Sequence, residues 1–186
     1  MALGFDERGL LPEGLHLCDE RQFSDLLVKR FPEGSTRAAV RDGFFEFRQR
    51  AAQHGICGMQ WVDGSYVTKK LLPSDVDVVT FVAADHVNNL SDEAKLFVQE
   101  TMARPHGALQ FKTDSYVVVV REPGHPAYDA YERWRLYWRD LYGHTRPIRL
   151  PDGSELPRLP KGMLSMGVGS PAERPNVSEE VGADAT

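Results

Sequence analysis

Two short polar motifs near the middle of the chain contain the residue types that bind phosphate and metal ions. They are Gly64-Ser65 and, after nine intervening residues, Asp75-Val76-Asp77. Glycine lets a backbone approach a phosphate closely, and a serine hydroxyl with nearby N–H groups can bond to its oxygens. Two aspartates at i and i+2 of a strand project from one face with Cα atoms about 6.5 Å apart. Both carboxylates can then reach a pair of Mg²⁺ ions about 3.5–4 Å apart, so the pattern is typical of a metal and phosphate pocket.

The elements predicted around these motifs would hold them at the end of a sheet. Apolar, valine-rich runs predict strands at residues 56–62, 75–82 and 109–120. Helical periodicity and capping residues predict four helices, at residues 19–31, 35–54, 91–102 and 126–142. These elements indicate an α/β (α+β) protein with a small mixed sheet and flanking helices.

The ends of the chain are predicted to be less regular. Residues 1–17 contain several Gly and Pro residues and predict an irregular arm before a domain at residues 18–166. Pro151-Asp152-Gly153 predicts the turn of a small C-terminal hairpin. Residues 167–186 have little apolar surface to bury, and so predict a disordered acidic tail.

Composition and charge exclude several classes of protein. The formal net charge of −5 argues against a surface that clamps nucleic acid as a whole, although it allows a local basic patch. Cys18 and Cys57 are too few and too far apart for a disulfide framework. The N-terminus lacks the pattern of a signal peptide, and no apolar run reaches the roughly 20 residues that cross a bilayer. We therefore expect a cytoplasmic protein without a membrane segment.

With these motifs the chain resembles the DNA polymerase β-like nucleotidyltransferase superfamily, whose signature matches Gly64-Ser65, nine residues and Asp75-Val76-Asp77-Val78. It is more closely similar to an uncharacterised family of small prokaryotic nucleotidyltransferase-like proteins. Those proteins begin with an element matching Leu11-Pro12-Glu13-Gly14-Leu15-His16 and end with one resembling Pro160-Lys161-Gly162-Met163. The resemblance implies a nucleotidyltransferase fold that ends, in this chain, in an aromatic helix and a hairpin.

The resemblance also implies roles for particular residues. Gly64 and Ser65 would contact the triphosphate of an NTP such as ATP, and Asp75 and Asp77 would hold Mg²⁺ or Mn²⁺. A third acid on a neighbouring strand usually activates the attacking hydroxyl, and Asp114 is the candidate for this role and for metal binding. A solvent-facing or edge-protecting charge is an equally good interpretation of Asp114.

Residues near the two motifs leave alternatives open. Lys69 and Lys70, between the motifs, either neutralise a phosphate or are solvated surface lysines. Asp63 departs from the superfamily pattern, in which an apolar residue precedes the Gly-Ser pair. A carboxylate at this position can satisfy N–H groups of the turn.

The predicted helix at residues 126–142 mixes aromatic residues with arginines. Such a mixture suits the stacking of nucleic acid bases or a protein interface. Packing against the sheet is the first expectation for Trp134 and Trp138. The arginines of this helix stay undecided.

Taken together, the motifs predict transfer of a nucleoside monophosphate from an NTP to an acceptor hydroxyl by two-metal catalysis. A partner protein, an RNA end or a small molecule could supply the acceptor. The alternative is an inactive nucleotidyltransferase-like interaction module, for example a component of a toxin–antitoxin or phage-defence pair. The location of Asp114 separates the two hypotheses, since catalysis needs that acid beside Asp75 and Asp77.

Overall fold

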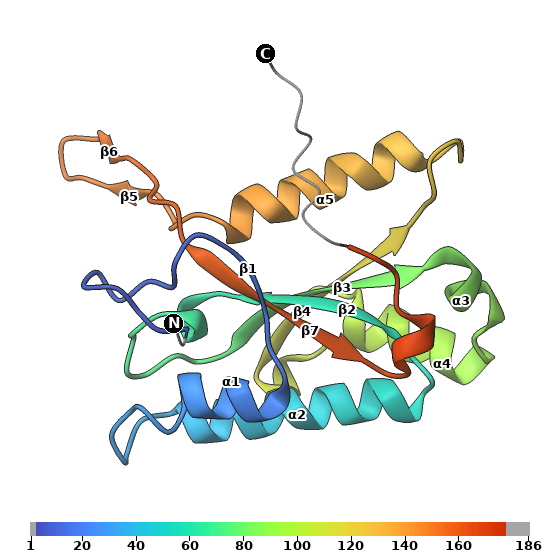
Figure 1. The fold of residues 1–186 in the computed structure, drawn as a ribbon, viewed down its shortest axis with the longest axis horizontal. Coiled ribbons are helices and arrows are strands. Elements are labelled where there is room, and N and C mark those ends of the chain that lie inside the picture. The colour runs from blue at the N-terminus through green and yellow to red at the C-terminus, as the bar shows by residue number, and fades with distance from the viewer. Residues whose placement is uncertain (1–2, 178–186) are drawn as a thin grey trace.

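A computed structural model describes residues 3–177, and a five-stranded mixed sheet lies at its centre (Figure 1). Its strands, in spatial order, are β1 (Gly14–Leu17), β7 (Gly162–Val168), β2 (Gly58–Asp63), β3 (Val76–Ala83) and β4 (Thr113–Val120). Strand β2 is antiparallel to β7 and β3, whereas β1 pairs with β7 and β3 pairs with β4 in parallel. The predicted mixed α/β architecture with flanking helices is thereby confirmed.

Helices cover both faces of this sheet. Helices α1 (Glu20–Leu27) and α2 (Arg37–Gln53) lie on one side, and α5 (Tyr128–Tyr142) lies on the other (Figure 1). The connection from β3 to β4 contains α3 (Ala84–Asn89) and α4 (Asp92–Phe97), and α4 runs into a π-helical turn at Val98–Met102. The predicted hairpin is present as β5 (Ile148–Arg149) and β6 (Glu155–Leu156).

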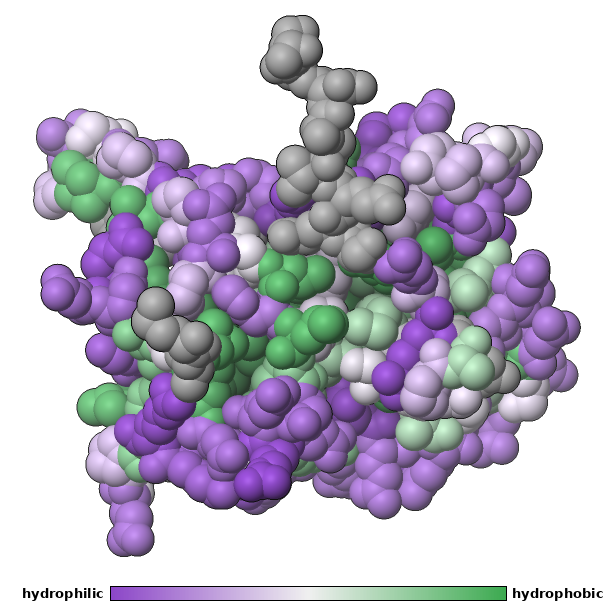
Figure 2. All heavy atoms as spheres, viewed as in Figure 1, coloured by the Kyte–Doolittle hydropathy of each residue, from purple (hydrophilic) through white to green (hydrophobic). Residues whose placement is uncertain are grey.

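The core has two parts because successive side chains of a strand point to opposite faces. On β3, Val76 and Val78 pack toward α1 and α2, whereas Val79 and Phe81 pack toward α5. Asp77 shares the alternation of Val79 and therefore lies on the α5 side of the sheet. In Figure 2, hydrophilic residues cover the outward side of α1 and α2, as expected of amphipathic helices packed on a sheet.

Local signals placed the helix starts well. Helix α1 begins with a capping box in which Asp19 and Gln22 satisfy each other's backbone N–H groups, and Ser91 caps α4 as predicted. Helix α1 ends at Leu27, earlier than the predicted residue 31. The predicted strand at residues 109–120 starts only at Thr113. Its first three residues, Leu109–Phe111, form a 3₁₀ turn instead.

The expectation of an irregular arm and a disordered tail was wrong where the two segments join the sheet. Strand β1 ends the arm at Gly14–Leu17, and β7 continues to Val168 inside the predicted tail. Val177 is also buried, and only residues 178–186 of that tail lie outside the described part. The two strands pair with each other from opposite ends of the chain, and β7 also pairs with β2, which places it inside the sheet.

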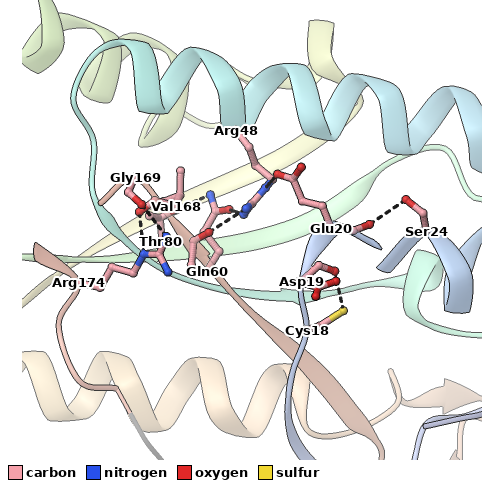
Figure 3. A network of polar contacts seen from close by, with 11 residues as sticks. Cys18, Asp19, Glu20, Ser24, Arg48, Gln60, Thr80, Val168, Gly169 and Arg174 are labelled. Carbon is pink, nitrogen blue, oxygen red and sulfur yellow. Dashed lines mark hydrogen bonds and ion pairs between the residues drawn. The ribbon is translucent and has the colours of Figure 1, made fainter. Parts of the chain in front are cut away.

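A buried arginine of α2, Arg48, forms hydrogen bonds that link α2 to strands β2 and β7 (Figure 3). Arg48 on α2 donates to the side chain of Gln60 on β2 and, at 2.8 Å, to the carbonyl of Gly167. It also contacts the Glu20 carboxylate at 3.2 Å. Gln60 in turn donates to the Thr80 hydroxyl at 3.2 Å. The buried side chains of Arg48, Gln60 and Thr80 therefore all have hydrogen-bond partners, which keeps the cost of their burial low.

Candidate functional site

A cavity of about 830 Å³ lies between one end of the sheet and α5. The Gly-Ser turn and the loop before β3 form one wall, and α5 with the segment after it forms the other. All of the acidic candidates from the sequence line it, namely Asp75, Asp77 and Asp114, together with Asp63. The size is in the range of pockets that hold small organic ligands, roughly 300–1,000 Å³.

Three aspartates stand side by side on adjacent strands at this end of the sheet. Asp63 of β2 pairs with Asp77 of β3, and Asp77 pairs in parallel register with Asp114 of β4. Neighbouring strands lie about 4.8 Å apart, so the three Cα atoms form a short row across the sheet. Asp75 directly precedes β3 and lines the same cavity. Strand pairing thus brings Asp77 and Asp114 together, and Asp75 lines the same cavity.

The acidic row holds more negative charge than its surroundings neutralise. Burial, helped by the charges of Asp63 and Asp75, raises the pKa of Asp77 to about 6. Arg146 is the nearby cation, and its Nη2 lies 3.9 Å from Asp77 Oδ1 while its side chain is largely exposed. Asp114 Oδ2 accepts a hydrogen bond of 3.3 Å from the Tyr116 hydroxyl. Its Oδ1 is buried and has no hydrogen-bond partner among the described residues.

Asp63 differs from the other acids because a buried lysine neutralises it. Lys161, directly before β7, donates to the Asp63 carboxylate and, at 2.9 Å, to the carbonyl of Tyr142. Burial raises the pKa of Asp63, while Lys161 and the backbone N–H of Gly64 act in the opposite direction. The interpretation of Asp63 as a turn-satisfying residue therefore missed its main partner. The ion pair leaves Asp75, Asp77 and Asp114 as the acids available to a ligand.

Gly64 allows the turn to pass directly against Asp77. Its φ of 86° is in the left-handed region, and a Cβ atom at this position would overlap the Asp77 carboxylate. Ser65 then opens a 3₁₀ turn, Ser65–Val67. The glycine is thus required for both backbone conformation and space, and it brings the backbone of the turn to the acids.

A residue that the sequence analysis missed holds this loop in place. The Arg37 guanidinium is fully buried and donates only to backbone carbonyls. Those of Leu27 and Tyr66 lie at 3.1 and 2.8 Å, Lys70 accepts at 2.7 Å, and Thr68 accepts as well. Burial lowers the pKa of Arg37 to about 10. The signal in the sequence was an arginine on the apolar stripe of its helix, three and seven residues before Val40 and Phe44.

The two lysines of the loop face different surroundings. Lys69 Nζ donates to the carbonyl of Asp6 at 3.2 Å, so it points toward the N-terminal segment. Lys70 lines the cavity near the acids. Of the two lysines predicted as candidates for neutralising a phosphate, Lys70 is therefore at the cavity, whereas Lys69 is not among its lining residues.

Aromatic side chains form the wall opposite the loop. Tyr116 contacts Trp138 with ring centroids 4.6 Å apart, Trp138 contacts Tyr137 at 5.2 Å, and Tyr137 contacts Trp134 at 5.7 Å. Trp138 is buried on the sheet as expected, but the expectation for Trp134 was wrong, since it is 56% exposed. Trp134, Tyr137 and Leu141 recur at three and four residues on the flank of α5 that faces the cavity, beside the stripe that packs on the sheet.

The donor set suits a metal that is shared with phosphate. No group of three or more His, Cys, Asp or Glu residues within residues 3–177 is arranged to hold a metal alone. Mg²⁺ is usually bound by one or two carboxylates together with substrate phosphates and waters. Asp77 and Asp114, whose Oδ1 is buried and has no hydrogen-bond partner among the described residues, fit that kind of site.

The fold and this acidic cavity define a small mixed α/β protein with a charged pocket at the end of its sheet. The chain belongs to a family of unknown function, DUF6932, whose model matches residues 3–167. No curated protein and no solved structure matches it. Among the helices of the described residues, none has the length and apolar character needed to cross a membrane.

Proposed function

We propose that the protein is a metal-dependent nucleotidyltransferase that transfers a nucleoside monophosphate from an NTP to an acceptor hydroxyl. The observation that carries this proposal is the direct pairing of Asp77 with Asp114, next to a glycine-serine turn. An acid in this place can take the proton of a nucleophile bound at the same metal–phosphate pocket. The nucleotidyltransferase fold suggested by the signature motifs is part of the same proposal.

Different residues of the cavity have different roles in the proposed reaction. The backbone of Gly64 and the Ser65 hydroxyl bind the β- and γ-phosphates, and Lys70 adds a positive charge. Asp114 orients the acceptor hydroxyl and accepts its proton. The acceptor oxygen forms a bond to the α-phosphorus, the bond to the bridging oxygen breaks, and pyrophosphate leaves with that electron pair. Asp77 and Asp114 would hold Mg²⁺ or Mn²⁺ together with the phosphates, with Asp75 at the edge of the same cavity, and the metal would supply positive charge to the reacting phosphates.

The excess negative charge of the cavity supports this proposal over an inactive interaction module. A surface that only binds a protein gains nothing from an acidic row in which the pKa of Asp77 is raised to about 6. Like charges held this close cost stability, and such costs are concentrated at functional sites. A divalent cation with a triphosphate removes the repulsion.

The test is label transfer from α-³²P-labelled NTPs, offered singly with Mg²⁺ or Mn²⁺, to the macromolecules of a cell extract. Wild-type protein is expected to label an acceptor, and the Asp75→Asn/Asp77→Asn variant to lose at least about 100-fold of that activity. Asp114→Asn is expected to lose a similar amount, since it removes the proton acceptor. The matched control is Asp85→Asn, an exposed acid on α3 outside the cavity.

Two outcomes would count against the proposal. Equal labelling by wild type and Asp75→Asn/Asp77→Asn would remove these residues from catalysis. Absence of labelling with every NTP, together with absence of metal-dependent NTP binding by calorimetry, would favour the interaction module. A cytoplasmic location, with a partner protein or RNA as the source of the acceptor, completes the proposal.

A further inference from the structure

A buried tyrosine hydroxyl in the wall of the cavity has no hydrogen-bond partner within residues 3–177. It belongs to Tyr142, the last residue of α5, which lines the cavity and is only 3% exposed. Buried side-chain hydroxyls are nearly always paired, because an unpaired donor gives up its hydrogen bonds to water and gains none in return. The hydroxyl of Tyr142 is therefore a group that a ligand of the cavity could satisfy.

Two other tyrosines near the cavity show the usual arrangement. The Tyr66 hydroxyl is completely buried and donates to the backbone carbonyl of Arg37 at 2.8 Å. The Tyr116 hydroxyl donates to the Asp114 carboxylate at 3.3 Å. Both hydroxyls contribute to the internal structure of the described chain, whereas that of Tyr142 does not.

Lys161 holds Tyr142 at the side of the cavity where the Gly-Ser turn lies. The lysine ammonium group donates to the Tyr142 carbonyl at 2.9 Å and also to the Asp63 carboxylate. Asp63 is the last residue of β2, and Gly64 follows it directly. One buried lysine thus connects the end of α5 to the turn that approaches the acids.

The surroundings of the hydroxyl determine which kind of ligand it can take. Burial, together with the charges of Asp77 and Asp63, raises the pKa of Tyr142 well above its ordinary value, so the hydroxyl stays protonated and can donate. The carboxylates would repel a bare anion, and a metal ion alone makes no use of an O–H donor. A phosphate that carries a divalent metal meets both conditions, because its oxygens accept hydrogen bonds while the metal faces the acids.

Two cations make the end of α5 suitable for a phosphate. The C-terminal end of a helix carries partial negative charge, which by itself would weaken anion binding. Lys161 offsets this charge at the Tyr142 carbonyl. Arg146 lines the cavity four residues beyond Tyr142, with a largely exposed side chain whose Nη2 lies 3.9 Å from Asp77 Oδ1.

We propose that the C-terminal end of α5 forms a phosphate subsite in which the Tyr142 hydroxyl donates a hydrogen bond to a non-bridging oxygen of a metal-bound triphosphate. This inference rests on the proposed function, because it takes the triphosphate of that reaction as the ligand. It adds a contact from the wall opposite the Gly-Ser turn. The hydroxyl then contributes to ligand binding and adds nothing to the stability of the ligand-free protein.

The test compares Tyr142→Phe with wild type in two measurements. Calorimetric titration with inorganic triphosphate in excess Mg²⁺ should give an affinity at least about 10-fold lower for the variant, as expected for the loss of one hydrogen bond to a charged group. Urea denaturation without ligand should give a midpoint equal to or higher than that of wild type, because the hydroxyl has no partner in the described protein. A tyrosine of purely structural importance would show the opposite pattern.

Two further Tyr→Phe variants serve as references. Tyr131→Phe makes the same change at a buried position of α5 that does not line the cavity, and should leave the triphosphate affinity unchanged. Tyr66→Phe removes a hydroxyl that is bound to the Arg37 carbonyl, and should lower the urea midpoint.

A separate titration with Mn²⁺ alone, followed by electron paramagnetic resonance, checks which part of the ligand the hydroxyl contacts. Wild type and Tyr142→Phe should give the same result, because the hydroxyl contacts the phosphate and not the metal. A lower Mn²⁺ affinity of Tyr142→Phe would assign the hydroxyl to the metal and overturn the inference.

The remaining outcomes distinguish this inference from the proposed function. Unchanged triphosphate affinity in Tyr142→Phe overturns the inference, as does a lower urea midpoint or a failure of this variant to fold, since the hydroxyl would then have a structural role. Absence of triphosphate binding by wild type also overturns it, even if transfer from an NTP is found. Triphosphate binding that weakens as expected in Tyr142→Phe, without transfer by wild type from any NTP, would instead overturn the proposed function alone.

Discussion

The two walls of the cavity are built on different physical principles. The wall made by the Gly-Ser turn and the acids is held by buried charges, namely Arg37 on backbone carbonyls and Lys161 on Asp63. The α5 wall is an amphipathic helix whose sheet-facing side packs while its neighbouring flank stays open to the cavity. The first wall is held by buried groups that depend on each other, whereas the exposed flank of α5 carries side chains with no such dependent partner.

This difference bears on how each wall responds to substitution. Removing one partner from a buried polar contact leaves the other without compensation, so the cost far exceeds the net worth of the contact. An exposed ring on a helix flank has no such dependent partner. We therefore expect the buried Arg37 and Lys161 contacts that hold the acidic wall to be intolerant of change, whereas the exposed flank of α5 is the place where ligand preference can vary at little cost to folding.

Lys161→Met should give the largest loss of stability. It leaves Asp63 buried without its cation, and such a loss costs about 3–5 kcal/mol. Urea denaturation of the purified variant measures it. Lys29→Met, at an exposed ion pair on the surface near α1, is the control and should change stability by less than about 1 kcal/mol.

A second substitution tests whether the loss of stability in Lys161→Met comes from the unpaired carboxylate of Asp63. Adding Asp63→Asn to Lys161→Met removes the unpaired carboxylate and should recover a large part of the lost free energy of unfolding. If the double variant is as unstable as the sum of the two single ones, the pair does not act as a unit, and the contrast between the walls fails.

Arg37→Met should lower the free energy of unfolding by about 3 kcal/mol, less than Lys161→Met. The substitution keeps an apolar stem of similar length but strands several buried carbonyls of the loop. The denaturation midpoint is the measurement. Arg50→Met, at an exposed position on the same helix, should leave that midpoint nearly unchanged. A stable Arg37→Met protein would show that water or a rearranged loop can replace the guanidinium.

Asp77→Asn is expected to raise stability at pH 7 by about 2 kcal/mol in the absence of divalent cations. The pKa of Asp77 in the folded state, about 6, lies above its ordinary value of 3.8, so between these values the folded protein binds more protons than the unfolded chain. Stability due to this group therefore falls as the pH rises from about 4 to about 6. Denaturation at several pH values should show the advantage of the variant vanish below about pH 4.

The matched acid for this experiment is Asp85. Asp85→Asn changes the same functional group at an exposed position on α3, and should show no such pH-dependent gain. An Asp77→Asn variant that is less stable than wild type at pH 7 would mean that the acidic row is not strained in the folded protein.

Trp134→Ala should have the smallest effect on stability, within about 0.5 kcal/mol, because the side chain is mostly exposed. Trp138→Ala on the same helix removes a ring packed between Tyr116 and Tyr142, and should cost about 3–5 kcal/mol. The difference between the two thermal midpoints measures how far α5 separates its packing stripe from its cavity flank. Similar losses in both variants would contradict that separation.

Much of the fold could be predicted from local sequence patterns. Periodicity and capping identified α2, α4 and α5, and the valine-rich runs identified β3 and most of β4. Strands β1 and β7 escaped detection; they pair with each other from opposite ends of the chain, and β7, which contains two glycines, also pairs with β2. Four residues that include a glycine, in the case of β1, have too little pattern of their own to be recognised as a strand.

For the candidate site, the sequence by itself determined the chemistry of the turn and the acids, because the spacing of Gly64, Ser65, Asp75 and Asp77 is local to one strand–loop–strand unit. The tertiary structure decided which distant residues complete it. Parallel pairing put Asp114 beside Asp77, and β7 brought Lys161 to Asp63. The rotation of α5 on the sheet decided that Trp138 packs while Trp134 faces the cavity. The spacing of residues along a helix determines which side chains share a face of that helix. Only the packing of the helix on the sheet decides which of its faces is buried in the core.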